Sequence, residues 1–114
     1  MRWLSGVVAL ALAAGATAPA VRAQDGGDPR AGRRLAGARC AVCHGNDGIA
    51  VLPDAANLAG QTAIYVTNQL RAFRSGDRKS EQMNLMAQEL TDAQIADLAA
   101  WYSSIEIEAM VPGR

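Results

Sequence analysis

The sequence has few aromatic residues, two cysteines and one histidine, and it has no excess of charge of either sign. Lys and Arg together number 11 in 114 residues, and Asp and Glu together also number 11, so a strongly basic nucleic-acid-binding protein is not indicated. A single pair of cysteines cannot supply the several disulfides on which small exported domains rely. The sequence contains no sustained alternation of β-branched and aromatic residues and no internal repeat, so nothing in it predicts strands. These absences leave one small all-α domain as the expected fold class.

The beginning of the chain differs in composition from the rest. Arg2 precedes an apolar run over residues 4–18, and small residues follow up to Ala23. The run is too short to span a bilayer comfortably, and this order of positive start, apolar middle and small-residue exit is typical of a secretory signal peptide. We therefore expect residues 1–23 to be a signal peptide and residues 24–114 to be an exported domain that has no membrane span.

Capping residues and apolar spacing predict three main helices. The first is expected over residues 29–41, because Asp28 followed by proline is a favourable helix start. The second is expected over residues 62–76, between a threonine cap and a terminal glycine. The third is expected over residues 91–105, because a Thr-x-x-Gln capping box opens it. The domain is therefore predicted to be helical throughout.

Two long connections separate the predicted helices, over residues 45–61 and 76–90. Loops of this length in a small domain usually wrap around something. The aromatic residues after position 23 are Tyr65, Phe73, Trp101 and Tyr102. They are too few to fill the core of a domain of this size, where burial barely offsets chain entropy. We expect a bound group to fill the centre.

The segment Cys40-Ala41-Val42-Cys43-His44 has the C-x-x-C-H pattern of covalent c-type haem attachment. Positions three and four apart share one face of a helical turn, so both sulfurs can reach the haem vinyl groups while His44 approaches the iron from the same side. A thioredoxin-like redox pair would need a βαβ setting, and a zinc site would need about four protein ligands. The motif therefore predicts one haem c with its iron, held covalently by Cys40 and Cys43, with His44 as the proximal iron ligand.

The sixth coordination position of the iron needs another residue type, because the chain has no second histidine. A methionine thioether is the usual partner of histidine in electron-transfer haem sites. The residues that could serve are Met83, Met86, Met110 and Lys79. Met110 follows the last predicted helix and is interpreted as a tail residue. Met83 and Met86 both lie in the second long connection, where one would bind the iron and the other would pack.

A further set of residues accompanies the C-x-x-C-H motif between Asp28 and about Ser104. They are Gly45, Gly48, Leu58-Ala59-Gly60-Gln61, Tyr65, Gln69, Leu70, Phe73, Gly76, Arg78, Met83, Leu90-Thr91-Asp92, Ile95 and Trp101-Tyr102. With these residues the sequence resembles the class I c-type cytochromes. Within them it is similar to a single domain of cytochrome c4 and to the short bacterial cytochromes of the c553 type. The resemblance implies the class I cytochrome c fold, in which three main helices and two long loops surround one covalently attached haem.

The resemblance also distinguishes the two methionines. In this family the ligand methionine lies seven residues before the apolar residue of a Leu-Ser/Thr-Asp cap. Counting back from Leu90 gives Met83 as the implied distal ligand. Met86 is the alternative, at a position often held by a second methionine that does not bind the iron.

Two further expectations concern residues around the haem. Family members usually have a proline two residues before the leucine of the Leu-Ala-Gly-Gln stretch, near the carbonyl that orients the proximal histidine. This chain has Ala56 there, with Pro53 three residues earlier, so the carbonyl that accepts from His44 is left open. Gly32 in the first helix could allow a close approach to Trp101 or Tyr102, or it could simply be a tolerated helix glycine.

If protein ligands fill both axial positions, the iron has no open site for a substrate. The predicted function is therefore one-electron transfer by a periplasmic mono-haem cytochrome, and not catalysis. Its expected partners are redox proteins, such as a dehydrogenase or a terminal oxidase, and not nucleic acid. The alternative is a haem-bearing electron-transfer subunit of a periplasmic dehydrogenase complex.

Two rows of basic residues could form docking patches for an acidic redox partner. Each row could equally be an ordinary solvated helix face, since this spacing is common on exposed helices. The rows are Arg71, Arg74, Arg78 and Lys79 in one, and Arg30, Arg33 and Arg34 in the other.

Overall fold

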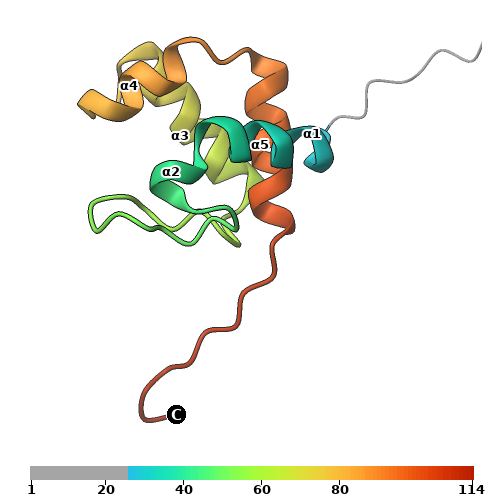
Figure 1. Ribbon diagram of the computed structural model, residues 1–114, viewed down its shortest axis with the longest axis vertical. Coiled ribbons are helices and arrows are strands. Elements are labelled where there is room, and N and C mark those ends of the chain that lie inside the picture. The colour runs from blue at the N-terminus through green and yellow to red at the C-terminus, as the bar shows by residue number, and fades with distance from the viewer. Residues whose placement is uncertain (1–25) are drawn as a thin grey trace, which may run out of the picture.

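The computed structural model describes residues 26–114, which fold into five helices and contain no strand (Figure 1). The helices are α1 (Pro29–Arg39), α2 (Ala41–His44), α3 (Ala63–Ser75), α4 (Glu81–Gln88) and α5 (Asp92–Ser104). The predicted all-α class is confirmed. None of these helices is long and apolar enough to cross a membrane. The predicted signal peptide, residues 1–23, lies outside the described residues.

The first predicted helix is divided at Cys40. It begins as expected, because the Asp28 side chain accepts from the backbone N–H of Arg30 at 2.8 Å and proline occupies the first helical position. It ends at Arg39, two residues before the expected end near Ala41; the Cys40 N–H still donates to the Ala36 carbonyl at 2.8 Å, but Cys40 itself has φ −111°. Cys40 is thus both the C-cap residue of α1 and the N-cap residue of α2.

The other two predicted helices are confirmed as α3 and α5. Thr62 accepts from the backbone N–H of Tyr65 at 3.3 Å at the start of α3, and Gly76 ends that helix in the left-handed conformation, with φ 83°. Thr91 and Gln94 form both hydrogen bonds of a capping box, at 3.0 and 3.1 Å, at the start of α5. These local signals were sufficient to locate both helices.

The second predicted loop, residues 76–90, is wrong in part because it contains α4. Ser80 caps this helix by accepting from the backbone N–H of Met83 at 3.2 Å, and Asn84 accepts from the Ser80 N–H at 2.9 Å. The reciprocal bond thus comes from an asparagine at the fourth helical position, whereas the capping-box pattern expects Glu or Gln at the third. Met83 and Met86 therefore lie on a helix and not in a loop.

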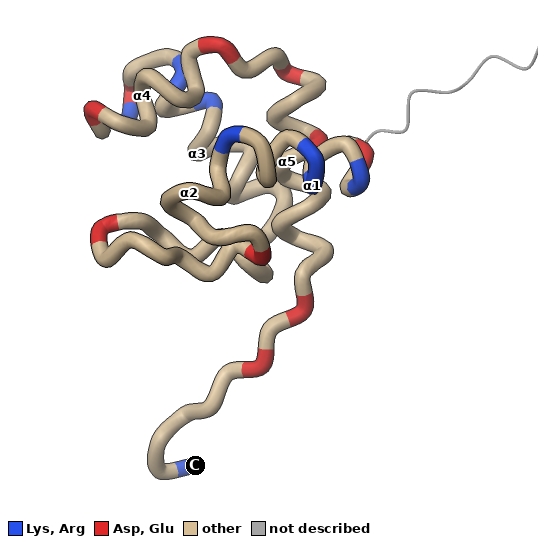
Figure 2. Tube along the Cα trace, in the orientation of Figure 1, with Lys and Arg blue, Asp and Glu red and all other residues tan. Residues whose placement is uncertain are grey.

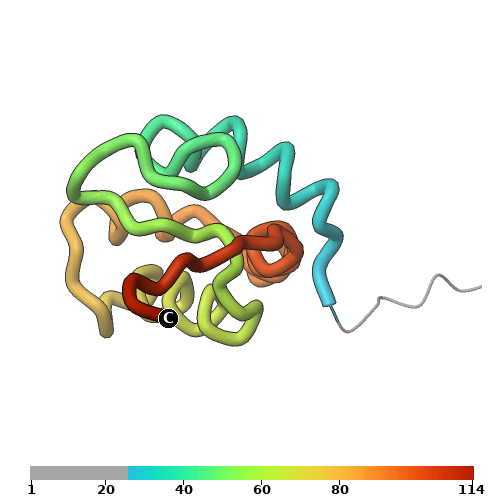
Figure 3. The backbone as a smooth tube through the Cα atoms, turned by 90° about the horizontal axis from the view of Figure 1, so that it is seen from below, coloured from blue at the N-terminus to red at the C-terminus, as the bar shows by residue number. Residues whose placement is uncertain are grey.

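α5 is the central helix of the fold. α1 crosses one side of it and α3 packs on another, while α4 packs along α3 (Figure 3). The buried core between the helices consists of Ala36, Val66, Phe73, Ala87, Leu90, Ile95, Leu98, Ala99 and Tyr102. Tyr102 and Phe73 are the only aromatic residues in this set, so the core is as small as the sequence predicted.

The crossing of α1 and α5 depends on Gly32. A Cβ atom at this position would collide with the Asp97 carbonyl and would lie 2.8 Å from Cβ of Trp101. Of the two possibilities left open at Gly32, the structure shows a close approach, but to the α5 backbone and the Cβ atom of Trp101 and not to an aromatic ring. Asp97 also fixes the start of α1, because its Oδ1 accepts from the Asp28 N–H at 2.7 Å.

Replacing Gly32 by alanine is expected to destabilise the protein. The added methyl group forces the two backbones apart, at a cost of about 1–3 kcal/mol or more in the free energy of unfolding. Gly37 is the matched control in the same helix, because a Cβ there meets no atom within 4 Å. Gly37→Ala should stabilise the protein by about 0.5–1 kcal/mol through helix propensity. Urea unfolding of both variants measures the difference, and a shift of equal sign in the two would contradict the close-crossing explanation.

Candidate haem site

The three residues of the C-x-x-C-H motif lie on one turn of the chain. Cys40 precedes α2, and Cys43 and His44 are its last two residues. The backbone N–H of His44 donates to the Cys40 carbonyl at 2.9 Å, which closes the turn. Both thiols are free and half-buried. The structure thus places both sulfurs and the imidazole on a single turn, as the spacing predicted.

The His44 ring is oriented by a backbone carbonyl. Its Nδ1 lies 2.7 Å from the carbonyl oxygen of Ala56. A carbonyl oxygen can only accept, so Nδ1 carries the proton and Nε2 presents its lone pair, which is the tautomer that a metal-binding imidazole needs. The accepting carbonyl, which the sequence left open, therefore belongs to Ala56.

The loop over residues 45–61 is held in shape by its own backbone. The N–H groups of Leu58 and Ala59 donate to the Gly48 carbonyl at 2.7 and 3.1 Å. Gly48 has φ 74°, and a Cβ there would lie 2.7 Å from the Ala59 nitrogen, so this position requires glycine. The Asn57 side chain accepts from the N–H of Ala50 at 2.7 Å. These bonds fold the loop back on itself.

The end of this loop is fastened to α5 and to the segment after it. The Gly60 N–H donates to the Tyr102 carbonyl at 3.0 Å. A Cβ on Gly60 would lie 2.9 Å from Cγ1 of Ile107, so the segment after α5 passes directly over this glycine. The carbonyl that supports His44 therefore stands on a loop anchored at both ends.

The surroundings of Cys40 fit a covalently attached haem. Burial raises the pKa of the Cys40 thiol and also raises the pKa of the nearby Tyr102 hydroxyl, so both keep their protons at neutral pH. The Tyr102 hydroxyl is buried beside the Cys40 sulfur and makes no well-formed hydrogen bond within residues 26–114. A thioether sulfur is a weak acceptor, so Cys40 could still accept from this hydroxyl with haem attached.

Apolar side chains around the motif are also left exposed. On α2 Val42 is 78% exposed, and on α4 Leu85 is 64% exposed. The loop between α2 and α3 adds the exposed residues Ile49, Val51 and Leu52. The elements that carry or flank the motif thus all leave some apolar surface in water.

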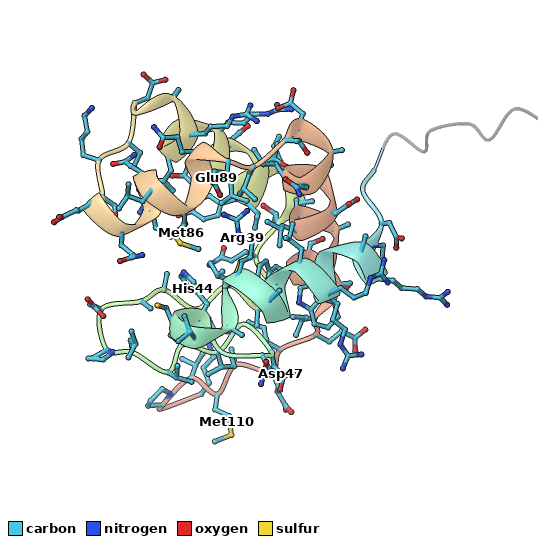
Figure 4. All side chains as sticks on the ribbon, turned by 45° about the horizontal axis from the view of Figure 1, so that its top comes forward. Arg39, His44, Asp47, Met86, Glu89 and Met110 are labelled. Carbon is cyan, nitrogen blue, oxygen red and sulfur yellow. The ribbon has the colours of Figure 1, made fainter. Side chains whose placement is uncertain are left out.

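Both candidate methionines lie on α4, three residues apart and so on one face of the helix. Met83 and Cys40 are both among the partly buried residues that pack against the core, whereas Met86 is half-buried and outside that set. In Figure 4 the side chains of Met86 and His44 point toward one another from α4 and α2. Met110 is 91% exposed beyond α5 and away from His44, as its interpretation as a tail residue predicted.

The basic row on α3 is only partly free to meet a partner. Arg74 donates to the Leu90 carbonyl at 2.9 Å and to the Asp92 carboxylate at 2.6 Å, and this contact lowers the pKa of Asp92. Arg78 donates to Gln69 at 2.6 Å and lies over the Phe73 ring. Figure 2 shows Lys and Arg on α1 and around α3, with Asp and Glu between them. Two members of the α3 row thus have structural roles.

The chain is similar to known proteins over most of its described length. The family model named cytochrome c matches residues 29–106. The chain is 46% identical over 83 residues to cytochrome c-554(548) of Halomonas halodenitrificans, which covers 70% of this chain and 99% of that protein. The crystal structure of reduced cytochrome c4 from Pseudomonas stutzeri has a similar fold, with a TM-score of 0.65 and 34% identity. This match covers 70% of this chain and 46% of that one, so the chain spans about half of that protein's length.

A third relative is named for its redox partner. It is the thiosulfate dehydrogenase electron acceptor of Stutzerimonas stutzeri, which is 35% identical over 69 residues. The match covers 58% of this chain and 32% of that protein.

Loss of the haem is expected to unfold the chain. Changing either Cys40 or Cys43 to alanine should give weak or lost haem retention, because one covalent attachment is removed. Without haem the small core cannot offset the conformational entropy lost on folding, as in other small domains that need a disulfide, a metal or another stabilising group. Far-ultraviolet circular dichroism and thermal melting of the haem-free chain test this expectation. A cooperative, native-like melt would contradict it.

Proposed function

The chain belongs to the cytochrome c family, and from this premise we propose that it is a periplasmic mono-haem carrier whose iron is bound by His44 and Met83. Members of this family carry covalently attached haem c with its iron and transfer electrons, so the chain is an electron-transfer protein and not an enzyme. The observation that most directly supports the proposed site is the 2.7 Å contact between His44 Nδ1 and the Ala56 carbonyl. It leaves Nε2 as the free ligand atom on the same turn as both thiols.

Each residue has a separate task in this proposal. Haem iron supplies a centre that gains or loses one electron. Cys40 and Cys43 hold the group through thioether bonds, and the Ala56 carbonyl sets the orientation of the His44 ring and increases its basicity. If His44 and Met83 both bind the iron, no position on it would remain for a substrate.

Two observations favour Met83 over Met86 as the distal ligand. The first is the family register, in which the ligand lies seven residues before the leucine at the start of the last helix, here Leu90. The second is that Met83, like Cys40, is one of the partly buried residues that pack against the core, whereas Met86 is not among them. The orientation of Met86 toward His44 in Figure 4 makes it the alternative that an experiment must distinguish.

A dehydrogenase is a second candidate for the partner or for the complex that contains this chain. The relative named thiosulfate dehydrogenase electron acceptor favours it. The test is to mix the oxidised protein with a thiosulfate dehydrogenase and thiosulfate and to follow haem reduction by absorbance. Reduction at the rate of a small-molecule mediator control, or slower, would argue against this partner.

The basic proposal is tested by purifying the protein from an export-competent, haem-loading host. We expect a coloured protein with the reduced spectrum of a c-type cytochrome. Its intact mass should correspond to residues 24–114 plus one haem, which also tests the signal peptide and the export that it implies. A colourless soluble protein would overturn the proposal.

The ligand assignment is tested by two matched variants. Met83→Ala should abolish the weak far-red absorption band of oxidised His/Met haem and lower the reduction potential markedly, because the axial thioether raises that potential. Met86→Ala should keep the band and cost less than the roughly 2–5 kcal/mol of a fully buried methionine, because this side chain is only half-buried. Loss of the band in the Met86 variant alone would move the ligand three residues along α4.

A further inference from the structure

The two sides of the proposed haem site belong to parts of the fold that scarcely pack on each other. His44 stands at the end of α2, which continues from α1, and both methionines stand on α4. The extensive helix contacts join α1 to α5, α3 to α5, α3 to α4 and α1 to α2. α4 is therefore held by α3 and has no extensive packing against the helices that carry Cys40 and His44.

One hydrogen-bonded ion pair connects the two sides directly. Arg39 donates through a guanidinium nitrogen to a carboxylate oxygen of Glu89 at 3.1 Å. Among the hydrogen bonds of residues 26–114, this one alone joins the segment 29–61 to the segment 76–90. Figure 4 shows both residues on the same side of the molecule as His44 and Met86.

The position of each partner links the two elements that carry the proposed ligands. Arg39 is the last residue of α1 and is followed directly by Cys40, so its backbone is continuous with the haem-attachment turn. Glu89 is the residue that caps the end of α4, six positions after Met83. A contact between their side chains thus ties the end of one ligand-bearing element to the start of the other.

The energy of such a pair is too small for global stability to be its main effect. The Arg39 side chain is 29% exposed and that of Glu89 is 77% exposed, and exposed ion pairs contribute little to the free energy of unfolding. If α4 moves away from the haem, few other contacts between segments 29–61 and 76–90 are broken. Even a weak ion pair therefore changes the frequency of this local opening.

We propose that Arg39 and Glu89 are positioning residues that hold α4 over the haem and thereby keep the methionine thioether on the iron. The inference rests on the proposed His/Met ligation. It assigns the pair a role in retaining the distal ligand and not in binding the haem or in transferring the electron.

The test measures how easily an external ligand displaces the methionine. Imidazole binds oxidised haem only when the thioether has left, so its apparent affinity reports the open fraction. We expect Arg39→Gln and Glu89→Gln each to raise the apparent affinity for imidazole about two- to fivefold, the range set by an exposed ion pair. Arg39→Lys retains the positive charge and should raise the apparent affinity for imidazole less than Arg39→Gln does.

A second ion pair of the same kind provides the control. Arg74 and Asp92 lie 2.6 Å apart with side chains 30% and 70% exposed, and they join α3 to the start of α5 without linking the two sides of the site. Asp92→Asn should therefore leave imidazole affinity unchanged while removing a comparable surface pair. In a Met83→Ala background, Glu89→Gln should also have no effect, because no thioether remains to be retained.

Each outcome has a distinct meaning. A far-red band in the unaltered protein together with equal imidazole affinity in all variants overturns the role of Arg39 and Glu89 but leaves the proposed function standing. Equal increases in Glu89→Gln and Asp92→Asn also overturn it, because they indicate general loosening. Absence of the band in the unaltered protein overturns the His/Met ligation and this inference with it.

Discussion

The close crossing of α1 and α5 at Gly32 is the contact on which the rest of the structure depends. Because no side chain separates the helices there, the Asp97 carbonyl lies directly against α1, and the direction of α1 follows from the axis of α5. That direction determines where Cys40 begins the haem-attachment turn. In a domain with so small a core, this backbone contact replaces much of the ordering that large side chains provide elsewhere.

The proximal side of the site is built outward from this crossing by hydrogen bonds. The loop over residues 45–61 folds on the Gly48 carbonyl and is fastened to Tyr102 on α5, so the Ala56 carbonyl is held relative to the same helix that positions α1. The His44 ring is therefore oriented by a rigid acceptor. The accepting group is the backbone carbonyl of Ala56, so its position depends on how the loop is folded and not on the side chain at position 56.

The distal side is built differently. α4 rests on α3, and Asn84 attaches its start to the Phe73 and Arg78 carbonyls at 2.7 and 2.8 Å. Toward the proximal side its one hydrogen-bonded link is the exposed Arg39–Glu89 pair. His44 thus belongs to the more constrained half of the site, whereas Met83 and Met86 stand on an element whose position few contacts determine. If one of these methionines binds the iron as proposed, its retention could be adjusted without disturbing the turn that carries both thiols.

Local sequence signals determined the structural features that depend only on residues close together in the chain. These are the caps at Asp28, Thr62 and Thr91, the helical class, and the C-x-x-C-H turn that places two thiols and an imidazole together. α4 was not predicted, because Asn84 completes its cap outside the capping-box pattern and because packing on α3 stabilises it. The carbonyl that meets His44, 12 residues away, and the pairing of Arg39 with Glu89, 50 residues away, were decided only by the tertiary structure. Contacts between distant segments depend on how helices cross and how loops close, and no spacing along the chain encodes those distances.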